Sequence, residues 1–134
     1  MIQNIRRSYK TDISSLSEVK RDLSHFLDEN NISIREIRQD IKLTVVELVT
    51  NIIKHTDESE DFEIESDFKE NTINLRLKYK DSQFRVPVDR FDSNKLAYNG
   101  FGMYLIKKLS DCIEYHYDEK NGEVTVNVTK RTDT

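Results

Sequence analysis

Apolar residues in the first part of the chain recur every three or four positions, which is the spacing of a buried helical face. A first helix is expected between Asp12, which would be its N-cap, and the pair Asn30-Asn31. Its buried face would consist of Ile13, Leu16, Val19, Leu23, Phe26 and Leu27. A second helix is expected from a capping box of Ser33 and Glu36 to about His55. Its buried face would consist of Ile34, Ile37, Ile41, Val45, Leu48 and Ile52.

After residue 60 the apolar residues alternate with polar ones, which indicates strands that have one buried face. Two strands are expected around a turn at Lys69-Glu70-Asn71, and two more around the hairpin signal Asn121-Gly122. Their inward positions are Phe62, Ile64, Phe68, Ile73, Leu75, Leu77, Tyr79, Ile113, Tyr115, Tyr117, Val124, Val126 and Val128, with Ser66 as an interruption. The pattern predicts an α+β fold, a two-layer sandwich in which helices cover one face of a mainly antiparallel sheet.

Three further segments complete the expected order of elements. Residues 2–9 have the pattern of a short first strand, residues 81–99 that of a loop, and Gly100 to about Ser110 that of a third helix. No repeat or linker divides the chain, so its 134 residues are expected to form one domain over residues 1–134.

Composition narrows the classes of function. The 21 basic and 25 acidic residues give a net charge of -4, which argues against a nucleic-acid partner. No stretch approaches the roughly 20 apolar residues that cross a bilayer, so no membrane association is expected. The single cysteine, Cys112, cannot form an internal disulfide, and the N-terminus has no apolar signal segment. These features favour a cytoplasmic protein.

Two groups of residues are candidates for chemistry. Glu47, Asn51 and His55 are spaced by four, so they form a row at the margin of the apolar face of the second helix. Gly100 and Gly102, two of only three glycines, open the third helix, where free backbone N–H groups favour a phosphate. Taken alone, the row also fits ordinary boundary residues, and the glycine pair also fits a tight junction between loop and helix.

Taken in order, these pieces form a more specific pattern. The helix carries Glu47-Leu-Val-Thr-Asn51-Ile-Ile-Lys-His55, two strands then lead to Asp81, and a loop precedes Gly100-Phe-Gly102-Met-Tyr-Leu-Ile106. This order resembles the GHKL ATPase superfamily, the ATP-binding fold of gyrase, chaperones and histidine kinases. Within that superfamily the chain is most similar to the bacterial anti-sigma-factor serine/threonine kinases, and the resemblance covers essentially the whole chain.

The resemblance implies ATP and Mg²⁺ as cofactors and a role for each matching residue. Asn51 would hold Mg²⁺, Glu47 would be the general base, and Asp81 would accept a hydrogen bond from the adenine amino group. Gly100 and Gly102 would let the chain approach the phosphates. The implied activity is the phosphorylation of an antagonist protein on serine, together with sequestration of a sigma factor or similar regulator. Relatives often dimerise through the first strand, so a homodimer through residues 2–9 is also implied.

The sequence departs from the family pattern after Asp81. Relatives have Asp-x-Gly-x-Gly, whereas this chain has Asp81-Ser-Gln83-Phe-Arg85. Tyr98 and Asn99 stand where relatives place a basic residue. The threonine that supports the aspartate in relatives is replaced by Gly122 or by Glu123, depending on the alignment.

These departures keep an alternative function open, a partner-binding regulatory module on the same fold with weak or no nucleotide turnover. The ATP-binding fragment of a sensor histidine kinase is a weaker alternative. His25 lies on a predicted helix, but no proline follows it, and no dimerising helical hairpin is expected before the domain.

Overall fold

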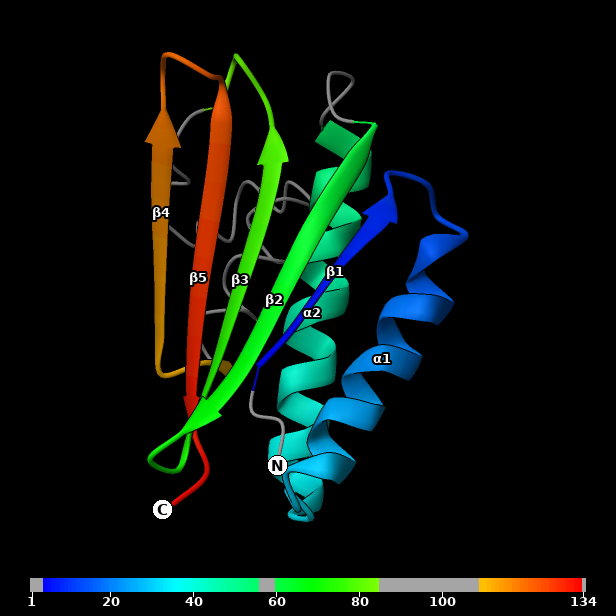
Figure 1. Cartoon of the computed structure of the whole chain (residues 1–134), viewed down its shortest axis with the longest axis vertical. Coiled ribbons are helices and arrows are strands. Elements are labelled where there is room, and N and C mark those ends of the chain that lie inside the picture. Colours follow the sequence, from blue (N-terminus) through cyan, green and yellow to red (C-terminus); the bar gives the residue numbers. More distant parts are fainter. Residues whose placement is uncertain (1–3, 56–59, 85–108, 134) are drawn as a thin grey trace, which may run out of the picture.

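The computed structural model describes residues 4–55, 60–84 and 109–133 of the chain. Within these ranges the chain forms two helices and one five-stranded sheet, and all neighbouring strands are antiparallel (Figure 1). The strand order is β1-β2-β3-β5-β4. The elements are β1 Asn4–Lys10, α1 Ser15–Glu29, α2 Arg35–His55, β2 Asp61–Lys69, β3 Thr72–Lys80, β4 Cys112–Asp118 and β5 Glu123–Arg131. The predicted α+β sandwich with an antiparallel sheet is confirmed.

The core lies between the inner face of the sheet and the two helices, which cover the same side of it (Figure 1). On the three central strands, apolar side chains at alternate positions have almost no exposed surface. These residues are Phe62, Ile73, Leu75, Leu77, Val124, Val126 and Val128. The helices contribute Val19, Leu23, Phe26, Leu27, Ile37, Ile41, Val45, Leu48, Val49 and Ile52. The period of two and the helical period therefore meet in one hydrophobic layer.

Both predicted hairpin turns are present. Between β2 and β3, Glu70 and Asn71 have φ values of 52° and 59°, the left-handed backbone that a tight turn between twisted strands requires. Between β4 and β5, Gly122 has a φ of 63°. A residue without a side chain suits that position because left-handed backbone strains most other residues.

The prediction for the start of α1 was wrong. The helix begins at Ser15, its N-cap is Ser14, and Ile13 lies before it with 61% of its surface exposed. Asp12 instead accepts a hydrogen bond from the Ser14 N–H (3.2 Å) in the preceding turn. Ser15 Oγ donates to the Lys10 carbonyl oxygen (2.6 Å), so the connection from β1 decides where the helix begins.

The predicted start of α2 was wrong in a similar way. The helix begins at Arg35, and Ile34, assigned to the buried face, is 52% exposed. The side chains of Ser33 and Glu36 form no hydrogen bond with any described residue, so the predicted capping box is not formed. The carbonyl oxygen of Ile34, the residue before the helix, accepts a hydrogen bond from the Arg38 N–H (3.1 Å).

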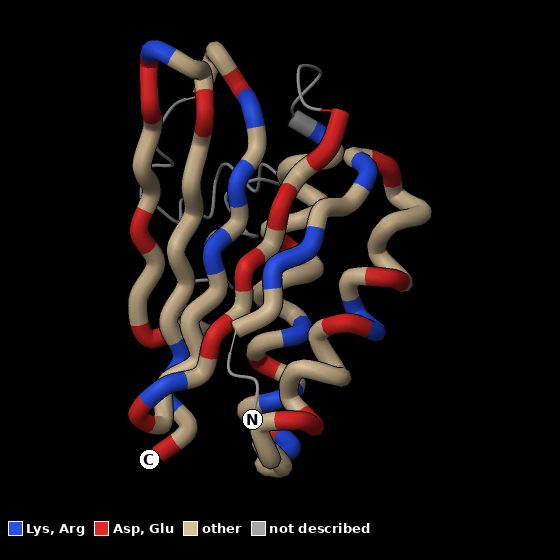
Figure 2. The backbone as a smooth tube through the Cα atoms, viewed as in Figure 1, with Lys and Arg blue, Asp and Glu red and all other residues tan. Residues whose placement is uncertain are grey.

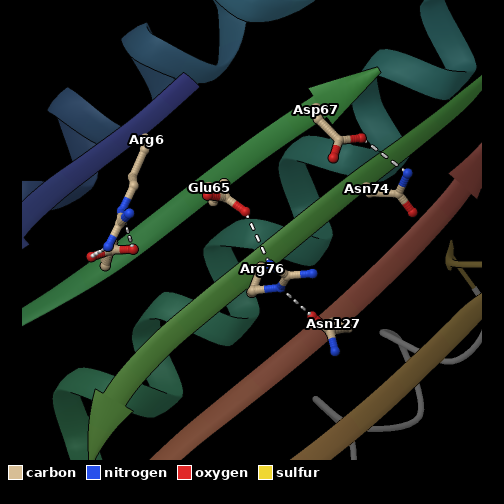
Figure 3. A network of polar contacts seen from close by, with 7 residues as sticks. Arg6, Glu65, Asp67, Asn74, Arg76 and Asn127 are labelled. Carbon is tan, nitrogen blue, oxygen red and sulfur yellow. Dashed lines mark hydrogen bonds and ion pairs between the residues drawn. The ribbon is translucent and has the colours of Figure 1, made fainter. Parts of the chain in front are cut away.

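The outer face of the sheet is polar. Acidic residues run along β2, and basic residues lie on β1 and β3 to either side of it (Figure 2). Cross-strand contacts pair Arg6 with Glu63 (2.7 Å), Arg76 with both Glu65 (3.1 Å) and Asn127 (3.0 Å), and Asn74 with Asp67 (3.1 Å) (Figure 3). Because such pairs stay close to water, each adds little stability.

Candidate functional site

The helix α2 presents two polar side chains at the margin of its buried face. Glu47 and Asn51 are both half-buried and lie one turn apart, and Leu48 between them is 4% exposed. In the described part of the chain, neither side chain makes a hydrogen bond or an ion pair. A carboxylate and an amide are thus partly withdrawn from water without hydrogen bonds to any described residue, which is a position suited to a ligand.

Polar contacts hold α2 in place from both sides. Lys130 Nζ on β5 lies 3.2 Å from Asp40 Oδ2, and the buried Thr44 Oγ1 donates to the Asp40 carbonyl oxygen (2.8 Å). Toward α1, Arg38 pairs with Asp28 (2.9 Å) and donates to the Ile32 carbonyl oxygen (2.8 Å). Glu47 and Asn51 therefore project from a helix that is held by contacts with both the sheet and α1.

Asp81 is the first residue after β3, and two backbone hydrogen bonds and one to its side chain define its turn. Its N–H donates to the Gly122 carbonyl oxygen (2.8 Å), and its own carbonyl oxygen accepts from the Phe84 N–H (3.2 Å). The Gln83 N–H donates to Asp81 Oδ1 (3.0 Å). The second carboxylate oxygen, Oδ2, has no hydrogen-bond partner within the described ranges. One oxygen thus orients the carboxylate, and the other remains an acceptor.

The register of the sheet decides which residue faces Asp81. Lys80 pairs with Glu123, and the next backbone hydrogen bond joins Asp81 to Gly122. The backbone of Gly122, in left-handed conformation, therefore lies directly beside Asp81.

Aromatic side chains lie on the inner face of the sheet beside this turn. Phe84 packs against two tyrosines of β4, with ring centroids 5.9 Å from Tyr115 and 5.7 Å from Tyr117. The Tyr117 hydroxyl donates to the Ser82 carbonyl oxygen (2.9 Å). Sequence reasoning missed the roles of Phe84 and Tyr117, because no spacing relates residue 84 to residue 117. Only the neighbouring positions of β3, β5 and β4 bring them together.

Two phenols in this region remain neutral over the physiological pH range. Burial is the main cause that raises the pKa of Tyr79 and of Tyr115, since a phenolate would be poorly solvated there. The Asp81 carboxylate raises the pKa of Tyr79 further, because it repels a second negative charge. The wall beside Asp81 is therefore uncharged and aromatic.

Some predicted site residues lie outside the described ranges. These are Gly100 and Gly102, as well as Arg85, Tyr98 and Asn99, while His55 ends α2 without a described side chain. Among the side chains that are described, no three His, Cys, Asp or Glu residues gather as a metal-binding group. Neither α1 nor α2, the helices bounded within the described residues, has the length and apolar character needed to cross a membrane.

Comparison with known proteins places this geometry in a family. The family model of the histidine kinase-like ATPase domain matches residues 9–130. No curated protein matches the chain. The fold is similar to the crystal structure of the RsbU and RsbW domains of Rv1364c from Mycobacterium tuberculosis, with a TM-score of 0.72 and 15% sequence identity. That match covers 97% of this chain but only 32% of the other. Because the family model extends over nearly the whole sequence, the chain belongs to the family of histidine kinase-like ATPase domains.

Proposed function

We propose that this chain is an ATP-dependent protein serine/threonine kinase of the anti-sigma-factor type. It would phosphorylate an antagonist protein and sequester a sigma factor or similar regulator. Membership in an ATPase family implies that ATP is bound. The observation that carries the proposal is the pair Glu47 and Asn51, half-buried on α2 and without a partner in the described part of the molecule. The fold shared with a structure that contains an RsbW domain supports the same assignment.

The residues on α2 fit a magnesium nucleotide. Mg²⁺ keeps several waters and takes few protein ligands, so the amide oxygen of Asn51, which has no hydrogen-bond partner among the described residues, suits it better than a closed cage would. Asn51 would hold the ion, which together with ATP supplies a phosphoryl group whose negative charge is partly neutralised. Gly100 and Gly102 would let backbone N–H groups approach the phosphates, and Asp81 Oδ2 would accept a hydrogen bond from the adenine amino group.

Glu47 has the role of general base in this proposal. As the serine oxygen of the antagonist forms its bond to the γ-phosphorus, the bond from that phosphorus to the leaving ADP oxygen breaks. The serine proton passes to the Glu47 carboxylate, which lies one turn before Asn51 and therefore on the same side of α2. Because Glu47 makes no hydrogen bond or ion pair with the described residues, its carboxylate is available for this step.

The same proposal includes protein partners and a place of action. In the described ranges β1 pairs only with β2, so its other edge offers free backbone groups to a second strand. We include a homodimer through this edge in the proposal. A protein that acts on a sigma factor would work in the cytoplasm.

Phosphoryl transfer from labelled Mg-ATP to a candidate antagonist tests the proposal. Glu47→Gln should lower the transfer rate about 10²- to 10⁴-fold, the usual contribution of a general base, with little change in thermal stability. Glu36→Gln makes the same chemical change at an exposed position on the same helix and should leave transfer unchanged. Equal rates for wild type and Glu47→Gln would refute the assignment of the base.

A second candidate function is a partner-binding module without turnover. It is favoured by the turn after Asp81, where Phe84 packs on Tyr115 and Tyr117 and the glycines of relatives are absent. If the wild-type protein shows neither phosphoryl transfer nor a thermal shift with nucleotide, the module replaces the kinase as the better explanation.

A further inference from the structure

The turn after Asp81 is held by a hydrogen bond from a side chain of β4, an edge strand of the sheet. We propose that Tyr117 is a positioning residue that sets the nucleobase preference of the site by orienting the Asp81 carboxylate. The inference rests on the proposed function, in which Asp81 faces the base of a bound nucleotide. It concerns which base is accepted and does not involve the transfer chemistry.

The argument begins with one peptide unit. The Tyr117 hydroxyl donates to the Ser82 carbonyl oxygen (2.9 Å), and the N–H of the same peptide group, which belongs to Gln83, donates to Asp81 Oδ1 (3.0 Å). Because a peptide group is planar, a contact that fixes its oxygen also fixes the direction of its N–H. Each bond also polarises the group and strengthens the other. The Tyr117 hydroxyl on β4 therefore orients the Asp81 carboxylate through the planar peptide group between Ser82 and Gln83.

The neighbouring strands and Phe84 keep this peptide group in place. Tyr79 on β3 and Tyr117 on β4 both pair with Val124 of β5, and β3 and β4 end at the same end of the sheet (Figure 1). The ring of Phe84 packs against Tyr117, and the backbone N–H of Phe84 donates to the Asp81 carbonyl oxygen (3.2 Å). The turn is thus held by the strand before it and by the edge strand two positions across the sheet.

The fixed carboxylate has a preference for one kind of base edge. With Oδ1 occupied by the Gln83 N–H, Oδ2 is an acceptor in a set direction. An amino group, as on position 6 of adenine, can donate to it, whereas the carbonyl of a 6-oxopurine meets it with like partial charge. A site built around a hydrogen bond rejects an analogue that cannot form it. If the carboxylate could rotate, it would lose part of this discrimination.

Tyr117→Phe removes the hydroxyl and keeps the ring that packs on Phe84. Dissociation constants for ATP and for ITP, which differ at position 6 of the base, should be measured by calorimetry with Mg²⁺. The wild type should prefer ATP, and Tyr117→Phe should lower the ratio of the ITP dissociation constant to the ATP dissociation constant about three- to tenfold, as expected for one neutral hydrogen bond. ITP affinity should hardly change, since the phosphate contacts remain.

Tyr9→Phe is the matched control. It also removes a phenol hydroxyl that donates a hydrogen bond, here to Asp22 Oδ2 (2.7 Å), but from β1 at the opposite edge of the sheet. It should lower stability and leave the ATP-to-ITP ratio at the wild-type value. A merely structural role of Tyr117 would make the two variants behave alike.

Hydrogen exchange at the Gln83 amide gives a second readout that needs no nucleotide. Exchange should be about three- to tenfold faster in Tyr117→Phe than in wild type, and unchanged in Tyr9→Phe. Unchanged exchange in Tyr117→Phe overturns the inference. So does an unchanged ATP-to-ITP ratio in a protein that binds ATP, and in that case the proposed kinase stands. A wild-type protein that binds neither nucleotide overturns the proposed function and the nucleobase preference together.

Discussion

The ion pair between Asp40 and Lys130 offers a quantitative test of how α2 is fixed to the sheet. Lys130 Nζ lies 3.2 Å from Asp40 Oδ2, and the two side chains are 15% and 30% exposed. Asp40→Asn keeps the size of the side chain and removes its charge. The ammonium group of Lys130 then stays largely out of water without an opposite charge, so the variant should be less stable.

The expected loss lies between two limits. Exposed ion pairs contribute about 0.2–1 kcal/mol, and breaking a fully buried pair costs about 3–5 kcal/mol. Lys130 is mostly buried while Asp40 keeps part of its hydration, so Asp40→Asn should lower the free energy of unfolding by about 1–2 kcal/mol. Lys130→Met preserves the aliphatic contacts, and the double variant should be little worse than Asp40→Asn alone. The coupling energy should then be about 1 kcal/mol.

Urea unfolding of the wild type, both single variants and the double variant measures this coupling. Lys10→Met serves as the control because it breaks a pair of similar length, 3.3 Å to Asp61, whose side chains are 76% and 50% exposed. That change should be within about 0.5 kcal/mol of zero. A coupling energy between Asp40 and Lys130 below about 0.3 kcal/mol would refute the reasoning, because the partial burial of Lys130 would then have no energetic consequence.

Two further perturbations follow from the backbone and the buried phenols. Gly122→Ala should cost about 1 kcal/mol in urea unfolding because of the left-handed backbone, and Gly122→Asn should cost less; a neutral alanine would contradict this. An added Cβ would meet Ser82 at 3.7 Å, an ordinary contact, so the cost is conformational. Burial raises the pKa of Tyr79 and Tyr115 in the folded state. The contribution of the neutral phenols to the free energy of unfolding is therefore complete below the unfolded pKa of about 10 and is lost as the pH rises above it. Urea midpoints should fall less steeply above about pH 10 in Tyr79→Phe than in wild type, and equal slopes would contradict the assigned burial effect.

Apolar periodicity alone predicts the layers and most of the elements that the structure describes. Alternation along residues 61–80 and 112–131 specifies which side chains of these strands face the core, because a period of two leaves each strand only one apolar face. The helical period likewise identified most of the buried face of α2 and put Glu47 and Asn51 at its margin, where both are half-buried. Resemblance to a family then attached chemistry to these positions, and the family model agrees with that resemblance.

The starts of the helices and the surroundings of Asp81 depend on packing and on strand pairing. Ile13 and Ile34 have the right spacing for a buried face, but the connection before each helix leaves them exposed. The position of Gly122 beside Asp81, and the contact of Tyr117 with Ser82, depend on the register of strands that are distant in sequence. Periodicity reports only which face of an element is apolar. Which residues meet across strands is settled by pairing and packing of the whole sheet, and no local pattern encodes it.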